Sequence, residues 1–198
     1  MNSLLVTYIL QTEKWTSPEL FETKNRIYTF LNPVSYLIAL ENKSLFEQFD
    51  GIFADGSLLV SAIRLVYGKR VTRRSFDMTS LAPELLNYLM ESRKTLYIVA
   101  SGQEQVECSV RIFQEQYPEL RIAGFRNGYF SSDAEMNKEA SHIVELNPDF
   151  LIVGMGALMQ EKFLLKVKKM GYQASALRVV ALFTKSAMNR MHYYPNWV

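Results

Sequence analysis

Hydrophobic and polar positions along the chain form two kinds of block. Short apolar runs end at glycine, asparagine or aspartate, which is typical of buried strands. Between them lie longer segments in which apolar residues recur every three or four positions, which predicts amphipathic helices. Strands that alternate with helices favour parallel strands covered on both faces. The pattern therefore predicts one α/β domain with a Rossmann-like, mostly parallel sheet and helices on both faces.

The boundaries of these blocks give the predicted elements. We expect strands at 3–10, 26–31, 52–55, 95–100, 120–125, 149–153 and 176–183. We expect helices at 34–48, 79–92, 103–117, 133–146 and 159–170, with one more after Gly56 and a short helical turn near Ser17. Pro33 suits the first turn of the helix at 34–48, because its fixed φ is already helical and its missing N–H has no helical partner there.

The stretch 50–67 carries the clearest local signal. A short apolar run at 52–54 is followed by Asp55 and Gly56, and then by the helical pattern. This order places Asp55 at the carboxyl edge of a sheet, where ligands bind in open α/β folds. Gly56 lets the backbone approach closely or take a positive φ. A helix-capping role for Asp55 is the alternative, and this turn alone leaves both interpretations open.

Three later strands also end in glycine, at Ser101-Gly102, Asn127-Gly128 and Gly154-Met155-Gly156. Glycine permits close backbone approach, and the helix starts that follow offer free N–H groups to an anion such as a nucleotide diphosphate. The full G-x-G-x-x-G dinucleotide pattern is missing, which argues against an NAD-type oxidoreductase, and plain turn glycines are the alternative. Gln160 and Glu161, in the next helical turn, either reach a bound sugar or form a solvated helix start.

Charge is unevenly distributed, although the net charge of the 198 residues is only +2. No acidic residue follows Glu161, whereas the basic residues after it are Lys162, Lys166, Lys168, Lys169, Arg178, Lys185 and Arg190. This asymmetry suggests an anionic partner, such as phosphate, nucleic acid or a membrane surface. The single cysteine, Cys108, excludes an internal disulfide and fits a reducing compartment.

Several classes of protein lack support in the sequence. We see neither a secretory signal peptide nor an apolar run long enough to span a bilayer. His142 and His192 stand alone, so no cluster has the spacing of metal ligands. The G-x-S-x-G elbow of serine hydrolases is also missing. We therefore expect no metal and no cofactor.

Several motifs occur here in a fixed order along the chain. They are Asn32-Pro33, Ala54-Asp55-Gly56, the basic loop at 68–77, Ser101-Gly102, Gly128-Tyr129-Phe130, Gly154-Met155-Gly156-Ala157 with Gln160-Glu161-Lys162, and the closing YYPNWV at 193–198. In this order they resemble the WecG/TagA/CpsF family of bacterial glycosyltransferases, over nearly the whole chain from Thr29 onward. The segments TFLNP, RRSFDMTSLA and YYPNWV resemble its capsule and exopolysaccharide branch more than its teichoic-acid branch.

The resemblance implies a metal-independent, inverting transfer of a sugar from a UDP-sugar to a polyprenyl-diphosphate-linked sugar. Asp55 would be the general base, Asn32 and Gln160 would hold sugar hydroxyls, and Arg74 would counter phosphate charge. We expect Asp55, Asn32 and Gln160 to line the main cleft together. Asp77 and Glu161 complete the expected substrate site. The expected nucleotide-binding residues are Ser101, Gly102, Gly128, Tyr129, Phe130, Gly154 and Gly156.

The chain departs from the family pattern in two places. Val180-Ala181 stands where many members carry Gly-Gly, and Thr184 where some carry Asp. Members also usually continue past the P-x-W motif into a basic appendage that contacts the membrane and supplies active-site arginines. We therefore expect a glycosyltransferase-like domain at 1–183 and a basic, aromatic tail at 184–198, a truncated appendage that lies on the membrane. Packing of Tyr193, Tyr194 and Trp197 on the protein's own core or on a second subunit is the alternative for the tail. The alternative from another class is a catalytically impaired subunit that binds a nucleotide sugar or polyprenyl phosphate.

The resemblance also sets expectations about location and partners. It implies a cytoplasmic protein, peripheral at the inner face of the cell membrane. The expected partners are the UDP-sugar, the polyprenyl-linked acceptor and the membrane surface, with a second copy or other glycan-assembly proteins as further candidates. We expect no nucleic acid partner.

Overall fold

Six parallel strands form one sheet in the computed structural model, which describes residues 4–178. The strand order is β2-β1-β6-β5-β3-β4. Their bounds are β1 (Ile27–Leu31), β2 (Gly51–Ala54), β3 (Thr95–Ala100), β4 (Arg121–Arg126), β5 (Phe150–Gly154) and β6 (Ser175–Arg178). Since every pairing is parallel, all the carboxyl ends lie on one edge of the sheet. The predicted Rossmann-like α/β fold is confirmed.

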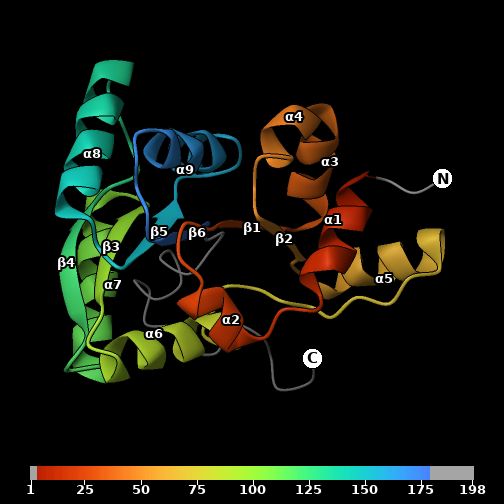
Figure 1. Cartoon of the computed structure of the whole chain (residues 1–198), viewed down its shortest axis with the longest axis horizontal. Coiled ribbons are helices and arrows are strands. Elements are labelled where there is room, and N and C mark those ends of the chain that lie inside the picture. The colour runs from red at the N-terminus through yellow and green to blue at the C-terminus, as the bar shows by residue number, and fades with distance from the viewer. Residues whose placement is uncertain (1–3, 179–198) are drawn as a thin grey trace.

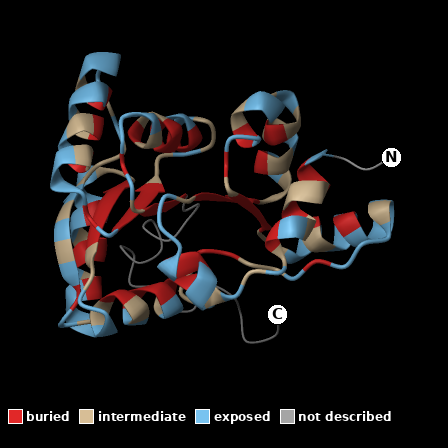
Figure 2. Ribbon diagram, in the orientation of Figure 1, coloured by how far each residue is buried: buried red, intermediate tan, exposed pale blue. Residues whose placement is uncertain are grey.

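Helices cover both faces of the sheet (Figure 1). One face carries α1 (Leu4–Thr12), α3 (Pro33–Glu41), α4 (Lys43–Phe46), α5 (Ser57–Tyr67), α8 (Asp133–Leu146) and α9 (Met159–Lys169). The other carries α2 (Ser17–Glu22), α6 (Leu81–Glu91) and α7 (Gln103–Gln116). Strands β1, β2, β3 and β5 are therefore buried and apolar on both sides, as strands of a covered parallel sheet are, whereas the edge strand β4 is exposed or half-buried along its length. In β1, Ile27 and Leu31 enter one core cluster while Tyr28 and Phe30 enter the other, and Figure 2 shows the central sheet as the buried part of the molecule.

The connections after β3 and β5 leave the sheet in opposite directions. β3 continues through α7 to β4 on one side, whereas β5 continues through α9 to β6 on the other side. The two helices also lie on opposite faces, because α7 packs into one core cluster and α9 into the other. This reversal makes the carboxyl ends of β3 and β5 a topological switch point, the position of the ligand-binding crevice in doubly wound sheets.

The predicted first strand is wrong, because the apolar segment at 3–10 is the helix α1. Leu5, Val6 and Ile9 are its buried apolar residues, a helical spacing, and α1 lies against β2 at the end of the sheet. Thr12 joins the two elements, since its hydroxyl oxygen accepts a hydrogen bond from the Ile52 N–H at 3.2 Å. A short apolar run that contains β-branched residues does not distinguish a strand from a buried helix.

The predicted helix at 34–48 is interrupted at Asn42, which has φ −122° and ψ 38°. The Asn42 amide donates to the Ile38 carbonyl at 2.8 Å, so its side chain competes with the helical backbone. The helical turn near Ser17 is α2, and the other predicted elements lie within a few residues of the observed ones. Of the predicted strand at 176–183, only the part within β6 belongs to the described residues. Val180, Ala181, Thr184 and the tail at 184–198 lie outside them.

Candidate active site at the carboxyl edge of the sheet

Asn32 and Asp55 follow neighbouring strands at the same edge. Leu31 of β1 pairs with Ala54 of β2, and the Asp55 N–H donates to the Leu31 carbonyl at 2.8 Å. Both side chains are half-buried. The two polar groups that end β1 and β2 therefore lie side by side, as the sequence predicts.

The turn after β2 leaves Asp55 outside the helix that follows. The N-cap residue of α5 is Gly56, with φ 89°, a conformation that L side chains rarely adopt. The N-cap position itself is therefore taken by Gly56, and whether Asp55 acts as a base or in capping the helix stays a prediction. Asn32, in contrast, is the N-cap of α3, and its side-chain oxygen accepts from the Ser35 N–H at 2.9 Å. Because the Asn32 side-chain oxygen is occupied in this way, the predicted contact with a sugar hydroxyl would chiefly use the Asn32 amide nitrogen.

Arg74 reaches this corner from the loop that follows α5. Its N–H donates to the Ala54 carbonyl at 2.9 Å, which brings its backbone next to the start of the Asp55 turn. Its guanidinium carbon lies 5.5 Å from the centre of the Phe53 ring, and Nη2 donates to the Glu13 carbonyl at 3.4 Å. Nη1 is buried and has no hydrogen-bond partner within the structure. The Arg74 backbone thus lies beside the Asp55 turn, whereas its guanidinium lies on Phe53, and a contact between this cation and a phosphate stays a prediction.

Asp77 holds the same loop in shape. Its Oδ2 accepts from Arg73 at 2.8 Å and from the Ser75 hydroxyl at 2.7 Å, and its Oδ1 accepts from the Thr79 N–H and hydroxyl at 2.8 and 2.7 Å. Burial by itself raises the pKa of Asp77, but the bonds from Thr79 and Ser75 and the charge of Arg73 outweigh it. The pKa of this carboxyl therefore lies below its usual range. These contacts assign Asp77 to the loop, and its contact with substrate stays a prediction.

The carboxyl ends of β3, β4 and β5 are tied together at Ser101. Its N–H donates to the Gly154 carbonyl at 3.0 Å, and its carbonyl accepts from the Gly128 N–H at 2.8 Å. Ser101 has φ 51°, an unfavourable conformation for a residue with a side chain, and such residues cluster at functional sites. Gly128 approaches its neighbour so closely that a Cβ there would lie 2.9 Å from Met155 Cγ. The predicted glycine turns thus meet at the crevice between β3 and β5.

Gln160 stands beside this crevice in the first turn of α9. Only 1% of the residue is exposed, and its Oε1 accepts from the Met155 N–H at 3.2 Å. Its Nε2 is buried without a hydrogen-bond partner in the structure. Gly156 and Leu158 shape the turn before it with φ values of 90° and 69°. An unsatisfied amide donor at this edge fits the predicted contact with a sugar hydroxyl.

Glu161 lies beneath the site as a link between two elements. It is fully buried, and its Oε1 accepts from the hydroxyl of Thr29 on β1 at 3.2 Å. Its Oε2 accepts from the Leu158 N–H at 2.7 Å, at the N-cap of α9. The predicted contact of Glu161 with substrate is untested. Thr29 was missed by the sequence analysis, although a polar residue inside an apolar strand was a signal for it.

Tyr129 and Phe130 differ in their surroundings. Tyr129 is 74% exposed, and its N–H donates to the Asn127 side-chain oxygen at 2.9 Å. The Phe130 ring centre lies 5.4 Å from that of Phe163 on α9, and the Arg126 guanidinium carbon lies 4.0 Å from the same ring centre. Phe130 thus anchors the loop on α9, while Tyr129 presents its ring to solvent. Their contact with a nucleotide stays a prediction.

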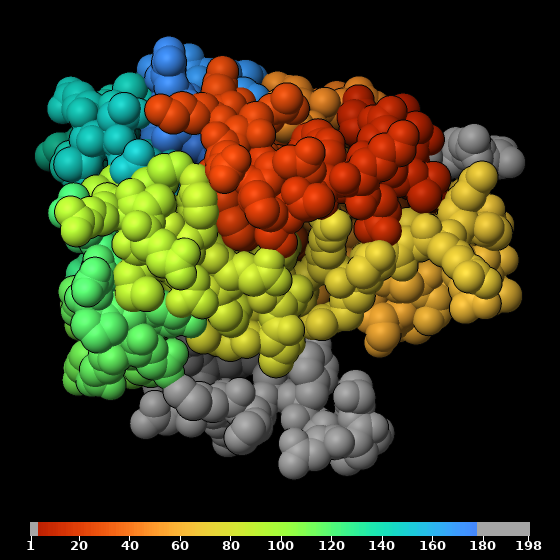
Figure 3. Space-filling model, turned by 60° about the horizontal axis from the view of Figure 1, so that its bottom comes forward, coloured from red at the N-terminus to blue at the C-terminus, as the bar shows by residue number. Residues whose placement is uncertain are grey.

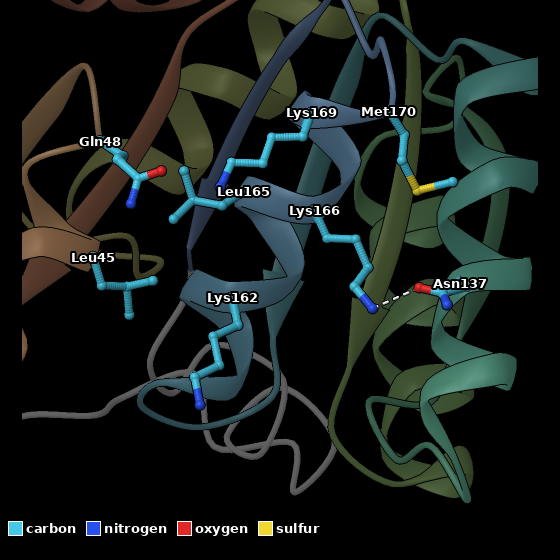
Figure 4. Close-up of a pocket in the computed structure, with 8 residues that line it drawn as sticks. All are labelled: Leu45, Gln48, Asn137, Lys162, Leu165, Lys166, Lys169 and Met170. Atoms are coloured by element: carbon cyan, nitrogen blue, oxygen red, sulfur yellow. Dashed lines mark hydrogen bonds between the residues drawn. The ribbon is translucent and has the colours of Figure 1, made fainter.

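A cavity of about 430 Å³ lies away from this edge, between α4, α8 and α9. Three lysines point along it from α9, and Lys166 donates to the Asn137 side-chain oxygen at 2.6 Å (Figure 4). None of the predicted site residues lines it; the residues that do are Leu45, Gln48, Asn137, Lys162, Leu165, Lys166, Lys169 and Met170. The shared edge of Asp55, Asn32 and Gln160 is therefore distinct from this cavity.

The described part of the chain offers neither a cluster of metal ligands nor a membrane-spanning helix. Among residues 4–178, no group of three or more His, Cys, Asp or Glu side chains is arranged to hold a metal ion. No helix in this range is both long and apolar enough to cross a bilayer.

The edge therefore combines groups with complementary chemistry. Asp55 stands next to Asn32, and the backbone of Arg74 lies against the same turn. The β3–β5 crevice beside them offers backbone turns of the kind that accommodate phosphates. Glu161 and Thr29 join α9, which carries Gln160, to β1, which precedes Asn32. Such a set suits proton removal from a hydroxyl group next to a bound phosphate ester.

Comparison with known proteins connects this arrangement to a family. Residues 10–198 match the model of the glycosyl transferase WecG/TagA/CpsF family. The chain is 30% identical over 172 residues to a UDP-Gal:alpha-D-GlcNAc-diphosphoundecaprenol beta-1,4-galactosyltransferase of Shigella boydii, covering 87% of this chain and 71% of that protein. It is 23% identical over 168 residues to an N-acetylglucosaminyldiphosphoundecaprenol N-acetyl-beta-D-mannosaminyltransferase of Bacillus subtilis (strain 168), covering 83% and 62%.

A protein of the same description from Bacillus spizizenii is 24% identical over 161 residues, covering 79% of this chain and 60% of that protein. The chain thus spans less than two thirds of the length of the two Bacillus relatives. The family model, however, covers the carboxyl-edge motifs from Asn32 to Gln160 and nearly the whole described fold. This chain belongs to the WecG/TagA/CpsF family of glycosyl transferases.

Proposed function

We propose that this chain transfers a sugar from a UDP-sugar to a polyprenyl-diphosphate-linked sugar, with inversion at the anomeric carbon and with Asp55 as the general base. The observation that carries the proposal is the shared edge. Asp55 and Asn32 directly follow two adjacent strands, and Gln160, whose Nε2 has no hydrogen-bond partner among the described residues, lies in the first turn of α9 at the same edge. Family membership supplies the reaction class.

In the proposed reaction, the acceptor hydroxyl oxygen attacks the anomeric carbon from the face opposite the UDP. The new carbon–oxygen bond forms as the bond to the β-phosphate oxygen breaks, and that electron pair leaves with UDP. Asp55 takes the hydroxyl proton. Arg74 Nη1 balances charge on the departing diphosphate, and Gln160 Nε2 donates to a sugar hydroxyl. Proton removal by a positioned base contributes about 10²–10⁴-fold to such a rate.

The relatives suggest the first substrates to test. The Shigella relative, at 30% identity, is named for UDP-Gal, whereas the two Bacillus relatives, at 23% and 24%, are named for transfer of N-acetylmannosamine. All three names include N-acetylglucosamine on diphosphoundecaprenol. We therefore propose this lipid-linked sugar as the acceptor and UDP-galactose as the first donor. The TFLNP, RRSFDMTSLA and YYPNWV segments support a place in capsule or exopolysaccharide synthesis at the inner face of the membrane.

The test is UDP release from UDP-sugars in the presence of the lipid-linked acceptor. We expect Asp55→Asn to lower turnover by about 10²–10⁴-fold with an unchanged melting temperature, since the amide cannot accept the proton. Asp133→Asn, at an exposed carboxylate of α8, is the matched control and should keep full turnover. If Asp55→Asn turns over as fast as the unmodified chain, the assignment of the base is wrong.

We also propose that the donor binds and reacts without a divalent ion. Calorimetry should then show the same UDP affinity in EDTA as in magnesium, and turnover should persist in EDTA. Binding that needs magnesium or manganese would contradict this proposal. UDP binding without turnover on any acceptor would instead favour the alternative of a non-catalytic binding subunit, for which Val180-Ala181 in place of Gly-Gly is the supporting observation.

A further inference from the structure

The helix that follows the candidate base exposes an apolar face. α5 begins two residues after Asp55 and buries only Leu59 and Ile63. On its outer side, Leu58 is 69% exposed and Leu65 is 87% exposed. The α5 apolar face consists of Leu58, Ala62, Leu65 and Val66, whose spacings of four, three and one keep them on one side of a helix. α5 is thus apolar toward the core and also toward solvent.

A second helix of the same sheet face, α3, also exposes apolar side chains. Val34 and Leu37 of α3 are 68% and 63% exposed. α3 and α5 start at the ends of the paired strands β1 and β2, and their buried residues join the same core cluster. Among the large apolar side chains of residues 4–178, the most exposed lie on these two helices, Tyr129 apart. In the views of Figures 1 and 3, α5 lies at the end of the molecule beyond β2. Exposed patches of this kind mark sites of protein or membrane interaction.

The charges that α5 and the loop after it carry have one sign. The sequence from Gly56 to Phe76 contains no acidic residue. Arg64 on α5 and Lys69 and Arg70 directly after it are exposed. An apolar helix face flanked by cations is the pattern of helices that lie in the interface of an anionic bilayer.

We propose that the α5 apolar face, together with Val34 and Leu37, is the surface by which the folded body docks on a bilayer that contains anionic phospholipids. The leucines enter the headgroup region, and Arg64, Lys69 and Arg70 contact lipid phosphates. The inference rests on the proposed function, because a polyprenyl-linked acceptor has its sugar at the membrane surface. Docking through α5 brings Asp55, two residues before the helix, to that surface.

A second copy of the chain is a poorer occupant of this surface. Two-fold symmetry would apply the same patch to both partners. Arg64, Lys69 and Arg70 of one copy would then approach the same cations of the other, without an acidic residue between 56 and 76 to balance them. Like charges across an interface oppose association, whereas an anionic bilayer supplies the missing charge.

Vesicle binding by the full chain tests the proposal. The probes are vesicles of phosphatidylcholine with and without phosphatidylglycerol. We expect Leu58→Gln combined with Leu65→Gln to weaken binding to the anionic vesicles by about tenfold, since two exposed leucines lose their transfer to the interface. Lys69→Ala combined with Arg70→Ala should weaken binding only when phosphatidylglycerol is present. Thermal melts followed by circular dichroism establish whether the variants fold. If the double variant does not fold, Leu65→Gln alone takes its place.

Leu146→Gln is the matched control. Leu146 is 42% exposed at the end of α8, at the opposite edge of the sheet from Asp55. This variant should bind vesicles like the unmodified chain. Unchanged binding by the Leu58/Leu65 variant overturns the proposal. Light scattering measures the oligomeric state of the same variant. If the unmodified chain is a dimer, the variant is a monomer and vesicle binding is unchanged, the face binds a second copy instead.

Turnover separates this inference from the proposed function. The Leu58/Leu65 variant should keep its rate on a short-chain, water-soluble acceptor and lose rate on an acceptor embedded in vesicles. Equal losses on both acceptors overturn the docking surface and leave the transferase function standing. If the unmodified chain turns over neither acceptor, the proposed function fails, while the vesicle result still decides the docking surface.

Discussion

Asp55 and Gln160 are placed at the sheet edge by different local devices. Asp55 is held by its own N–H, which continues the ladder to Leu31, and Gly56 then turns the chain into α5. Gln160 is held by its side chain, through the bond from the Met155 N–H. The first device leaves a carboxylate outside the helix, and the second leaves one amide donor without a partner. Gln160 therefore retains an amide donor that its structural role alone does not account for.

Gln160→Met separates ligand binding from stability. Removal of the orphaned Nε2 should stabilise the fold, because a buried donor without a partner is lost. Removal of Oε1 should destabilise the fold, because the Met155 N–H loses its acceptor. These effects are each about 1–3 kcal/mol, so the melting temperature should change little. The KM for the donor should rise about tenfold, equivalent to about 1.4 kcal/mol. Gln48→Met, at an exposed position remote from the edge, is the control. An unchanged KM would remove Gln160 from the donor site.

Asp77 gives a prediction about pH. Its folded-state pKa lies below the unfolded value of about 3.9. The carboxylate therefore stabilises the fold fully above that value, and the stabilisation is lost as the pH falls through the folded-state pKa. Asp77→Asn should lower the free energy of unfolding by about 1–2 kcal/mol at pH 7. In urea titrations, the difference in free energy of unfolding between Asp77→Asn and the unmodified chain should become smaller below about pH 4. If this difference instead becomes larger as the pH falls, the stabilising role of the Asp77 carboxylate is wrong.

At the scale of the elements, buried contacts of Glu161 connect α9 to β1. Its first turn carries Gln160, and Glu161 beside it joins Leu158 at the helix start to Thr29 on β1. β1 in turn ends at Asn32. The Glu161 contacts therefore relate the two halves of the candidate site, one at β1 and β2 and the other at β3 and β5.

Thr29→Val tests this link. Valine keeps the shape of threonine and removes the hydroxyl that donates to Glu161, so the free energy of unfolding should fall by about 1–2 kcal/mol in urea titrations. Since α9 loses a tie to β1, the affinity for the UDP-sugar should fall as well. Thr29→Ser retains the hydroxyl and should retain donor affinity. If the valine and serine variants bind the donor equally, the hydroxyl does not position α9.

Over the whole molecule, basic character gathers in two stretches of the chain. One is 56–76, which includes the α5 apolar face, and the other is the segment after Glu161, which ends in the basic and aromatic tail at 184–198. Both lack acidic residues. Two such stretches suit a protein whose acceptor substrate is anchored in an anionic membrane.

The tail yields a prediction of its own. Lys185→Glu combined with Arg190→Glu should weaken sedimentation with anionic vesicles at low salt, since each cation near the bilayer contributes about 1 kcal/mol. High salt should reduce binding of the unmodified chain by screening the same charges. If the two surfaces act independently, the losses in binding free energy from the tail variant and from the Leu58/Leu65 variant should add. Unchanged binding of the tail variant at low salt would contradict a membrane role for the tail.

The sequence alone predicted the fold class and most of the elements because their signals are local. Strands such as 95–100 and helices such as α8 have clear hydrophobic periods bounded by residues that break them. The positions of Asp55, Asn32 and Gly154 on one edge followed as well, since parallel strands all end on the same side. For a short apolar run, local pattern is ambiguous, and α1 was therefore predicted as a strand. The packing of this segment against β2 at the end of the sheet, rather than its sequence, decides between helix and strand.

Tertiary structure alone decided how the strand ends combine. The strand order β2-β1-β6-β5-β3-β4 and the opposite connections from β3 and β5 determine where the switch point lies. Neither can be read from the local hydrophobic period of the sequence. The same holds for the Glu161–Thr29 contact, whose partners are 132 residues apart, and for the unpaired donors of Arg74 and Gln160. The outward apolar face of α5 also required the structure, because sequence periodicity identifies an apolar helix but not which of its sides the core covers. Contacts between distant segments depend on packing, and packing is a property of the folded chain.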